Sequence, residues 1–168
     1  MKPPFVIERL AEHERAGFSS GTEGLDRYFK TRVTQDVRRH VANCFVALER
    51  DEGTIAGFYT IAAASVLTQD LPESAIRKLP RYPSLPAIRV GRLAVDQHFR
   101  GKGLGGALLA DAAARGLHTE AAAFAMLVDA KDSEAAAFYE HHGFQRLVSR
   151  PQSLFLALAT AEKARGQL

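Results

Sequence analysis

The sequence predicts an α/β fold in which helices pack on one mixed sheet. The second half of the chain alternates between strand and helix patterns, and the first half contains a hairpin signal. The chain has 168 residues, of which 46% are hydrophobic, so it can bury one core of ordinary size. We therefore expect residues 1–168 to form a single domain.

The first half predicts a strand, a helix and an antiparallel hairpin. From Thr22, apolar residues recur at steps of three and four, which is typical of a helix with one buried face. Two apolar runs flank a turn at 51–53, and the second is long enough for the centre of a sheet. Four of the seven prolines fall within residues 70–87, which predicts a substrate-side loop with one short helix. The expected elements are strands at 5–10, 43–50 and 54–66, and helices at 22–37 and 73–78.

The second half predicts a regular alternation of strands and helices. A glycine-rich run from Arg100 opens an alanine-rich and leucine-rich helix that we expect to end near Gly116. Gly143 follows the next helix, where glycine commonly provides the left-handed residue of a C-terminal cap. The expected elements are strands at 88–96, 124–130, 143–148 and 153–159, and helices at 100–116 and 133–142.

The cysteine content and the hydropathy of the chain predict a cellular location. A lone cysteine, Cys44, cannot form a disulfide within the chain and favours a reducing compartment. The N-terminal residues contain no apolar run of signal-peptide length, and no segment approaches the roughly 18 consecutive apolar residues of a membrane span. We therefore expect a soluble, cytoplasmic protein.

The formal net charge of +3 hides an uneven distribution of charge. Residues 27–40 carry a local balance of +4 and residues 77–102 carry +6, so the rest of the chain carries −7. Such segregation indicates an anionic partner. The alternative is that the two windows form separate solvated faces after folding.

The glycine-rich run from Arg100 to Gly106 lies where a strand and loop lead into a helix. Glycines let the backbone approach a ligand closely, and a helix N-terminus presents unpaired N–H groups with a partial positive charge. The run therefore suits a phosphate or pyrophosphate, to which Arg100 and Lys102 would add full charges. Alternatively, the glycines only permit close packing at the start of the helix.

Two common phosphate-binding patterns fit this run poorly. A P-loop needs Ser or Thr after its lysine, whereas Gly103 follows Lys102 and leaves no hydroxyl for Mg²⁺. The dinucleotide pattern GxGxxG occurs at Gly101, Gly103 and Gly106, but the polar residues 96–100 separate it from the preceding strand. Only about 60 residues follow, too few for the second half of a doubly wound domain.

Two motifs together resemble those of the GNAT acyltransferases. Arg100-x-x-Gly103-x-Gly105 is similar to the family's acetyl-CoA signature and, like that signature, follows a strand. The resemblance covers most of residues 40–158 and implies a central, mostly antiparallel, twisted sheet flanked by helices. The downstream block that resembles the family's second motif is Asp132-x-x-Ala135-x-x-Phe138-Tyr139-Glu140-x-x-Gly143-Phe144.

The resemblance implies that acetyl-CoA is the cosubstrate. Backbone groups at Leu93 and Val95 would bind the pantetheine arm, and Tyr139 would protonate the departing CoA thiolate. On residue pattern alone, Tyr139 would belong to the apolar stripe of a short helix. Asp132 stands where the family usually has Asn, and it also suits a helix N-cap. The implied cofactor-binding residues are Leu93, Ala94, Val95, Arg100, Gly101, Lys102, Gly103, Leu104, Gly105, Gly106, Asp132 and Phe138.

No residue stands out as a general base. Glu73 and Asp96 are candidates only by type, and the histidines show no spacing that suits a metal site. An α-amino group has a pKa near ~8, against ~10.4 for a lysine side chain, so it needs less help from a base. We therefore expect an α-amine acceptor and no metal. The histidines considered are His40, His98, His118, His141 and His142.

Within this family, the chain resembles the GNAT toxins of type II toxin–antitoxin modules nearly end to end. The run at 91–96, the glycine turn, the strand at 127–130 and residues 137–139 carry this resemblance, as do residues 18–29 and Leu79-Pro80. It implies acetylation of the α-amine of aminoacyl-tRNA, inhibition of translation, a ribbon-helix-helix antitoxin and a homodimer.

Binding of tRNA would also explain the basic windows, because lysine and arginine hold nucleic-acid phosphates. A GNAT enzyme acting on a small-molecule or protein amine is the alternative, and a non-catalytic CoA-binding or nucleotide-binding module is a third possibility. The last is disfavoured because the chain retains both the glycine turn and Tyr139. The candidate tRNA-binding residues are Arg38, Arg39, Arg77, Lys78, Arg81, Arg89 and Arg92.

Overall fold

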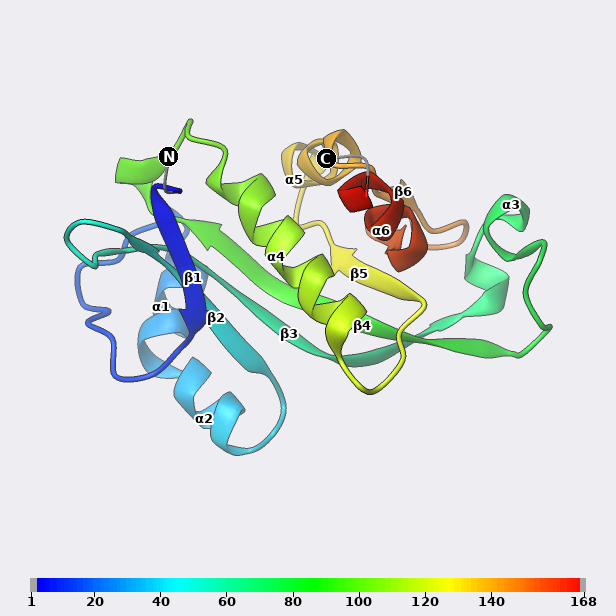
Figure 1. The fold of residues 1–168 in the computed structure, drawn as a ribbon, viewed down its shortest axis with the longest axis horizontal. Coiled ribbons are helices and arrows are strands. Elements are labelled where there is room, and N and C mark those ends of the chain that lie inside the picture. Colours follow the sequence, from blue (N-terminus) through cyan, green and yellow to red (C-terminus); the bar gives the residue numbers. More distant parts are fainter. Residues whose placement is uncertain (1–2, 167–168) are drawn as a thin grey trace. The chain divides into compact units, whose positions relative to one another are not determined.

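The computed structural model describes residues 3–166, which contain a seven-stranded sheet with the order β1-β2-β3-β4-β5-β7-β6 (Figure 1). Strands β4 and β5 pair in parallel, whereas β1–β2, β2–β3, β5–β7 and β6–β7 are antiparallel. This mixed sheet with accompanying helices confirms the predicted fold class. The strands are β1 (Phe5–Arg9), β2 (Asn43–Glu49), β3 (Ile55–Leu67), β4 (Ser84–Val95), β5 (Ala125–Asp129), β6 (Gln145–Arg146) and β7 (Ser153–Ala157). The helices are α1 (Glu23–Thr31), α2 (Val33–Arg38), α3 (Glu73–Ile76), α4 (Leu104–His118), α5 (Ser133–His141) and α6 (Leu158–Gly166), with short 3-10 helices η1 (Thr68–Asp70) and η2 (Gln97–Phe99).

The chain forms two compact units. The first comprises the described chain up to Ala62 together with Gly91–Ala112. The second comprises Ala63–Val90 and the described chain from Ala113 onward. The single domain expected from chain length stays a prediction.

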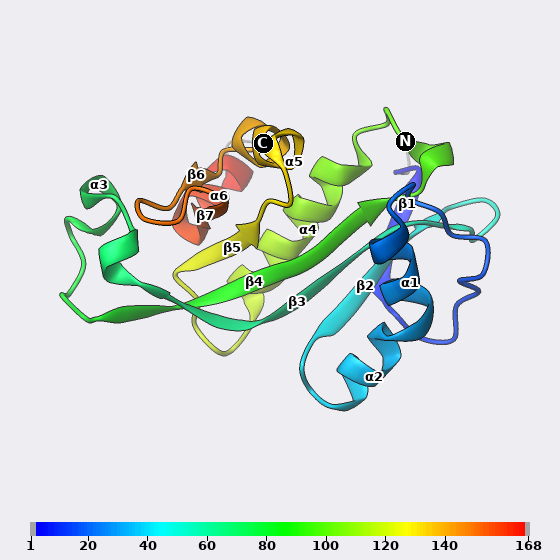
Figure 2. The same cartoon turned by 180° about the vertical axis from the view of Figure 1, so that it is seen from behind.

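Aromatic side chains form the core of the first unit. Phe29 of α1 stacks on Phe58 of β3 with ring centroids 4.2 Å apart, and Phe18 meets both rings edge-on. Val33 of α2 and Val46 of β2 are fully buried in the same cluster. Figure 2 shows α1 and α2 against one side of β2 and β3, so the N-terminal helices cover this face of the first unit.

The single helix predicted between residues 22 and 37 is in fact two helices. The chain leaves helical geometry at Arg32, where φ is −122°. In a continuous helix the carbonyl of Phe29 would accept a hydrogen bond from the N–H of Val33. The Arg15 guanidinium competes for that carbonyl with a 2.7 Å hydrogen bond and also donates to Thr34 Oγ1 at 3.0 Å. A side chain outside the helix therefore stabilises the break.

Strands β3 and β4 approach each other closely at Gly57. A Cβ atom at this position would lie 2.9 Å from the carbonyl oxygen of Ala94 and 3.1 Å from Cδ1 of Leu108 in α4. Tyr59 shares this face of β3, because strand side chains alternate, and its hydroxyl donates to Asp111 of α4 at 2.6 Å. The start of α4 therefore packs on the face opposite α1 and α2.

The second unit has a separate apolar core. Strand β5 lies between β4 and β7, and its first four residues are buried. The register pairs Ala87–Val90 of β4 with Ala125–Val128 of β5. The buried cluster consists of Val66, Leu71, Leu85, Ala87, Ala125, Leu127, Leu147 and Phe155.

Packing in the second unit overturns two expectations about helices. The helix expected to end near Gly116 continues to His118. Gly116 therefore lies inside α4 and does not end it. Glycine suits this position because a Cβ atom there would lie 2.6 Å from Cδ1 of Ile88 and 3.2 Å from Cδ1 of Leu158. Leu158, expected in the last strand, instead begins α6, which the sequence pattern did not predict. Its N–H donates to the carbonyl of Phe124 at 2.9 Å, at the point where the strand turns into a helix.

Other element boundaries differ by a few residues. The predicted strand at 143–148 contains only β6, and the short helix expected at 73–78 contains only α3. Strand β4 begins at Ser84, four residues earlier than expected. Gly143 has φ +94°, which confirms the predicted left-handed cap. Within residues 3–166, no helix is both long and apolar enough to cross a bilayer.

Replacing Gly57 with alanine should destabilise the first unit, by about 1–3 kcal/mol, because the added methyl group collides with a backbone oxygen that cannot move freely. Gly24→Ala is the matched control. No atom lies within 4 Å of a Cβ at Gly24, which is helical, so this change should be neutral or stabilise by up to ~1 kcal/mol. Urea unfolding measures both variants, and equal stabilities would contradict the proposed close approach.

Candidate functional site

The glycine turn that leads into α4 provides an open group of backbone donors. Gly101 and Gly103 have φ values of +77° and +76°, a conformation that favours glycine, and no atom lies within 4 Å of a Cβ built at either position. The carbonyl of Gly103 accepts the N–H of Ala107 at 3.1 Å, so the first helical bond begins here. The N–H groups just before Ala107 have no helical acceptor and can bind an anion. The turn is chemically suited to a pyrophosphate.

The two cations of this turn have different surroundings. The Arg100 guanidinium donates a hydrogen bond to the carbonyl of Ser20 and lies against Gly21, in the loop before α1. The ammonium of Lys102 is 5.5 Å from the centre of the Phe99 ring, and Lys102 is solvent-exposed. Arg100 therefore anchors the turn to the N-terminal loop, and Lys102 is the freer charge.

A buried hydroxyl of β3 contacts the backbone near the end of β4. The N–H of Arg92 donates to the hydroxyl of Thr60 at 3.1 Å, and Thr60 is only 1% exposed. Ala94 is buried in the core of the first unit, whereas Leu93 and Val95 are half-buried. Thr60 was not among the predicted site residues. Its signal was the one threonine within the largely apolar run at 55–67.

Asp96 is a buried carboxylate that accepts hydrogen bonds from two other residues. Burial disfavours its charged form, but hydrogen bonds from the N–H of Ser19 at 2.9 Å and from the N–H and ring of His98 at 2.8 Å hold its pKa below the ordinary value. The carboxylate thus joins the loop before α1 to η2. The other carboxylate considered, Glu73, lies exposed on α3.

Tyr139 lies on α5, in the second unit, within a group of aromatic rings. Its ring centroid is 5.3 Å from Phe138 and 5.6 Å from Phe144. Burial raises the pKa of the Tyr139 phenol, and the negative charge of Asp129 adds to this effect. The phenol therefore keeps its proton at neutral pH, as a proton donor must.

Two acidic residues near α5 have defined structural partners. Asp132 caps the helix, because its carboxylate accepts the N–H of Ala135 at 2.8 Å. Asp129 accepts hydrogen bonds of 2.6 Å from both Arg89 and Ser153. The capping role of Asp132 was predicted, whereas Asp129 was missed because its partners come from distant strands.

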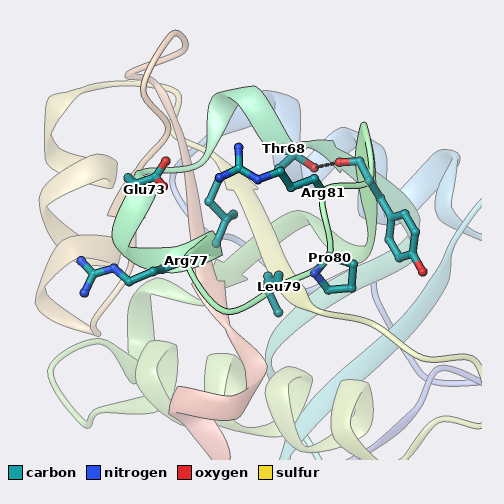
Figure 3. Close-up of a pocket in the computed structure, with 8 residues that line it drawn as sticks. Thr68, Glu73, Arg77, Leu79, Pro80 and Arg81 are labelled. Atoms are coloured by element: carbon teal, nitrogen blue, oxygen red, sulfur yellow. Dashed lines mark hydrogen bonds between the residues drawn. The ribbon is translucent and has the colours of Figure 1, made fainter.

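The cations considered for RNA binding differ in their contacts. Arg38 and Arg39 are exposed at the end of α2. Arg92 is stacked with its guanidinium carbon 3.7 Å from the centre of the Tyr28 ring, and Arg89 is paired with Asp129. Figure 3 shows a pocket around α3, and its lining residues are Thr68, Glu73, Ile76, Arg77, Leu79, Pro80, Arg81 and Tyr82. Lys78 lies exposed in the same segment.

Histidines do not form a metal site in the described part of the chain, which contains no group of three His, Cys, Asp or Glu side chains placed to hold a metal ion. His98 bonds to Asp96, and His142 packs on Phe138 with ring centroids 4.8 Å apart. Burial lowers the pKa of His142, and its neighbour His141 adds to the effect.

The chain is similar in sequence to a family of acetyltransferases and to two bacterial toxins. Residues 40–146 match the acetyltransferase (GNAT) domain family. The chain is 34% identical over 172 residues to the probable toxin TacT of Sinorhizobium fredii, with 96% of this chain and 95% of that protein covered. It is 36% identical over 146 residues to the tRNA-acetylating toxin of Mycobacterium tuberculosis, with 86% of each covered.

Solved structures share the fold. AtaT complexed with acetyl-methionyl-tRNAfMet superimposes with a TM-score of 0.85 at 25% identity, covering 96% of this chain and 99% of that chain. A tyrosine variant of AtaT bound to the C-terminus of the antitoxin AtaR and acetyl-CoA has a TM-score of 0.79 at 22% identity, covering 97% and 99%.

Asp132→Ala should reduce the free energy of unfolding by about 1 kcal/mol, because α5 loses its N-cap. Asp132→Asn should leave stability nearly unchanged, since asparagine caps a helix about as well as aspartate. Urea unfolding of the two variants against the parent chain measures the difference. If both variants are equally destabilised, the carboxylate charge matters beyond the cap.

Proposed function

Because the chain belongs to the GNAT acetyltransferase family, we propose that it is a toxin that transfers the acetyl group of acetyl-CoA to the α-amino group of aminoacyl-tRNA. An acetylated amine cannot form the next peptide bond, so the reaction inhibits translation. The observation that carries the proposal is the 36% identity, over 86% of both chains, to a tRNA-acetylating toxin.

The glycine turn is the proposed site of the CoA pyrophosphate. Its positive-φ glycines leave open space, and the N–H groups at Leu104, Gly105 and Gly106 precede the first bond of α4. Lys102 adds a mobile positive charge, and Arg100 holds the turn in place through Ser20. Backbone groups of residues 93–95 are the proposed partners of the pantetheine arm, and Asp132 and Phe138 are further proposed contacts.

Tyr139 is the proposed general acid. Acetyl-CoA supplies an activated thioester, and the acceptor amine forms the new C–N bond as the C–S bond breaks. Tyr139 donates its phenolic proton to the departing sulfur, and its raised pKa keeps that proton available. The acylated nitrogen loses one proton to solvent, and the Tyr139 phenolate regains one from solvent. A backbone N–H at residues 93–95 is the proposed donor to the acetyl oxygen as negative charge develops there.

The proposed acceptor is an α-amine because neither carboxylate considered lies in a setting typical of a general base. Asp96 is held by three hydrogen bonds, and Glu73 is exposed on α3. An α-amino group is substantially neutral near pH 7, so it attacks without a strong base. Arg38, Arg39 and the cations near α3 are the proposed contacts with tRNA phosphates.

The proposed partners follow from the proposed toxin function. We propose a ribbon-helix-helix antitoxin and a homodimer, and a cytoplasmic location where charged tRNA is present. Support comes from the similar toxin AtaT, which is bound to the C-terminus of its antitoxin.

Incubation with acetyl-CoA and a set of charged tRNAs tests the proposed function. Mass spectrometry of the aminoacyl end should show a gain of one acetyl group on at least one charged tRNA. Small amines and a protein mixture with free amines, in parallel reactions, cover the alternative acceptors. If only these amines are acetylated, the chain is a GNAT enzyme of another substrate class.

Tyr139→Phe should lower kcat by about 10²–10⁴-fold, because the leaving thiolate loses its proton donor. Binding of acetyl-CoA, measured by calorimetry, should remain nearly intact because the ring is retained. In the parent chain, the proton donor is lost only as pH rises through the phenol's pKa. That pKa is raised above the ordinary value of a phenol, so kcat should not fall through this group as pH rises from neutral toward that ordinary value, ~10. Unchanged turnover in the variant would exclude the proton-donor role.

A further inference from the structure

The segment between β3 and β4 carries cations that have no ion-pair partner within residues 3–166. We call residues 68–83 the α3 segment. Arg77, Lys78 and Arg81 are all exposed, and none of the three forms an ion pair or side-chain hydrogen bond with any residue of the described chain. Elsewhere in the same unit, Arg89 pairs with Asp129 and Arg146 pairs with Glu140. The α3 segment therefore presents three unpaired cations against one exposed carboxylate, that of Glu73, which lines the same pocket.

An exposed aromatic ring accompanies these cations. Tyr82 is 60% exposed and is one of the few large hydrophobic side chains that face solvent in the described residues. It lines the same pocket as Arg77 and Arg81. In Figure 3, Arg81 extends back toward α3, whereas Arg77 points away from the pocket. An exposed ring on a surface that also carries cations suits unpaired nucleotides, since bases stack on a ring and phosphates pair with cations.

The backbone that carries Tyr82 is held in a fixed conformation. The Thr68 hydroxyl donates to the carbonyl of Tyr82 at 2.5 Å (Figure 3), and the N–H of Tyr82 donates to the carbonyl of Pro80 at 3.0 Å. The N–H of Thr68 donates to the carbonyl of Pro83 at 3.0 Å. Leu79 packs on the core of the second unit. The ring is thus presented without the entropy cost of ordering a flexible loop.

We propose that the α3 segment binds the single-stranded 3′ end of the acceptor RNA, with a base stacked on Tyr82 and phosphates paired with Arg77, Lys78 and Arg81. This inference rests on the proposed function and names the part of the tRNA that this segment recognises. An acidic peptide would use the cations but would gain little from the exposed ring of Tyr82. A base-paired RNA stem offers phosphates but no free base to stack.

Binding of uncharged tRNA to the full chain, followed by fluorescence anisotropy, tests the proposal without requiring catalysis. Tyr82→Ala should weaken binding about tenfold, because one base loses its stacking partner. Tyr82→Phe should bind like the parent chain, since the ring remains. With a tRNA trimmed of its 3′ single-stranded nucleotides, the parent chain and Tyr82→Ala should bind equally.

The cations are tested by salt dependence. Replacing Arg77, Lys78 and Arg81 with alanine should flatten the slope of log K against log salt by about 2, because three phosphate contacts are removed. Lys163→Ala is the matched control, because this exposed lysine lies on α6, away from the proposed surface. Its slope should equal that of the parent chain.

Several outcomes overturn the proposal. The first is that Tyr82→Ala and the parent chain bind tRNA with equal affinity. The second is that Tyr82→Ala loses the same factor of affinity for intact and for trimmed tRNA. The third is that the parent chain does not bind tRNA. A change in oligomeric state of Tyr82→Ala, measured by sedimentation, would instead assign the surface to a second copy of this chain. If Tyr82-dependent binding is seen but no charged tRNA is acetylated, the proposed function fails and this inference stands.

Discussion

The close approach of β3 and β4 at Gly57 determines where α4 begins. Without a side chain at this position, the Ala94 carbonyl of β4 and Leu104 and Leu108 of α4 all come near the same point of β3. Leu104 is the first residue of α4 and directly follows Gly103 of the glycine turn. The packing of a small residue in the sheet thereby fixes the direction in which the turn presents its N–H groups. A larger residue at Gly57 would push α4 outward and carry the turn with it.

Electrostatic contacts divide the cations of the chain into structural and available groups. Arg15 breaks the N-terminal helix, Arg100 holds the glycine turn against Ser20, and Arg89 is paired with Asp129. Such arginines already have partners within the protein, so an incoming anion must compete with those partners. The cations of the α3 segment have no such partners within residues 3–166. A basic stretch of sequence thus contains both paired and unpaired cations. Only the unpaired cations can bind phosphates without first breaking an interaction within the protein.

Burial sets the chemistry of Tyr139. The aromatic neighbours Phe138 and Phe144 remove water from the phenol, which disfavours its ionised form, and Asp129 disfavours it further. Arg89 and Ser153 in turn hold the Asp129 carboxylate. The protonation state of one phenol therefore depends on residues from β4, β5, β7 and α5, which all belong to the second unit.

The sequence by itself determined the features that depend on neighbours along the chain. The glycine turn, the Asp132 cap and the left-handed Gly143 arise from local backbone preferences, which a short window of residues specifies. Tertiary structure decided the break at Arg32, the continuation of α4 through Gly116, the formation of α6 and the roles of Thr60 and Asp129. Each of these depends on an atom from a distant segment: the Arg15 guanidinium, the Ile88 side chain, the Phe124 carbonyl, the Arg92 amide and Arg89 respectively. Residue periodicity carries no information about such contacts, because they exist only after the strands have come together.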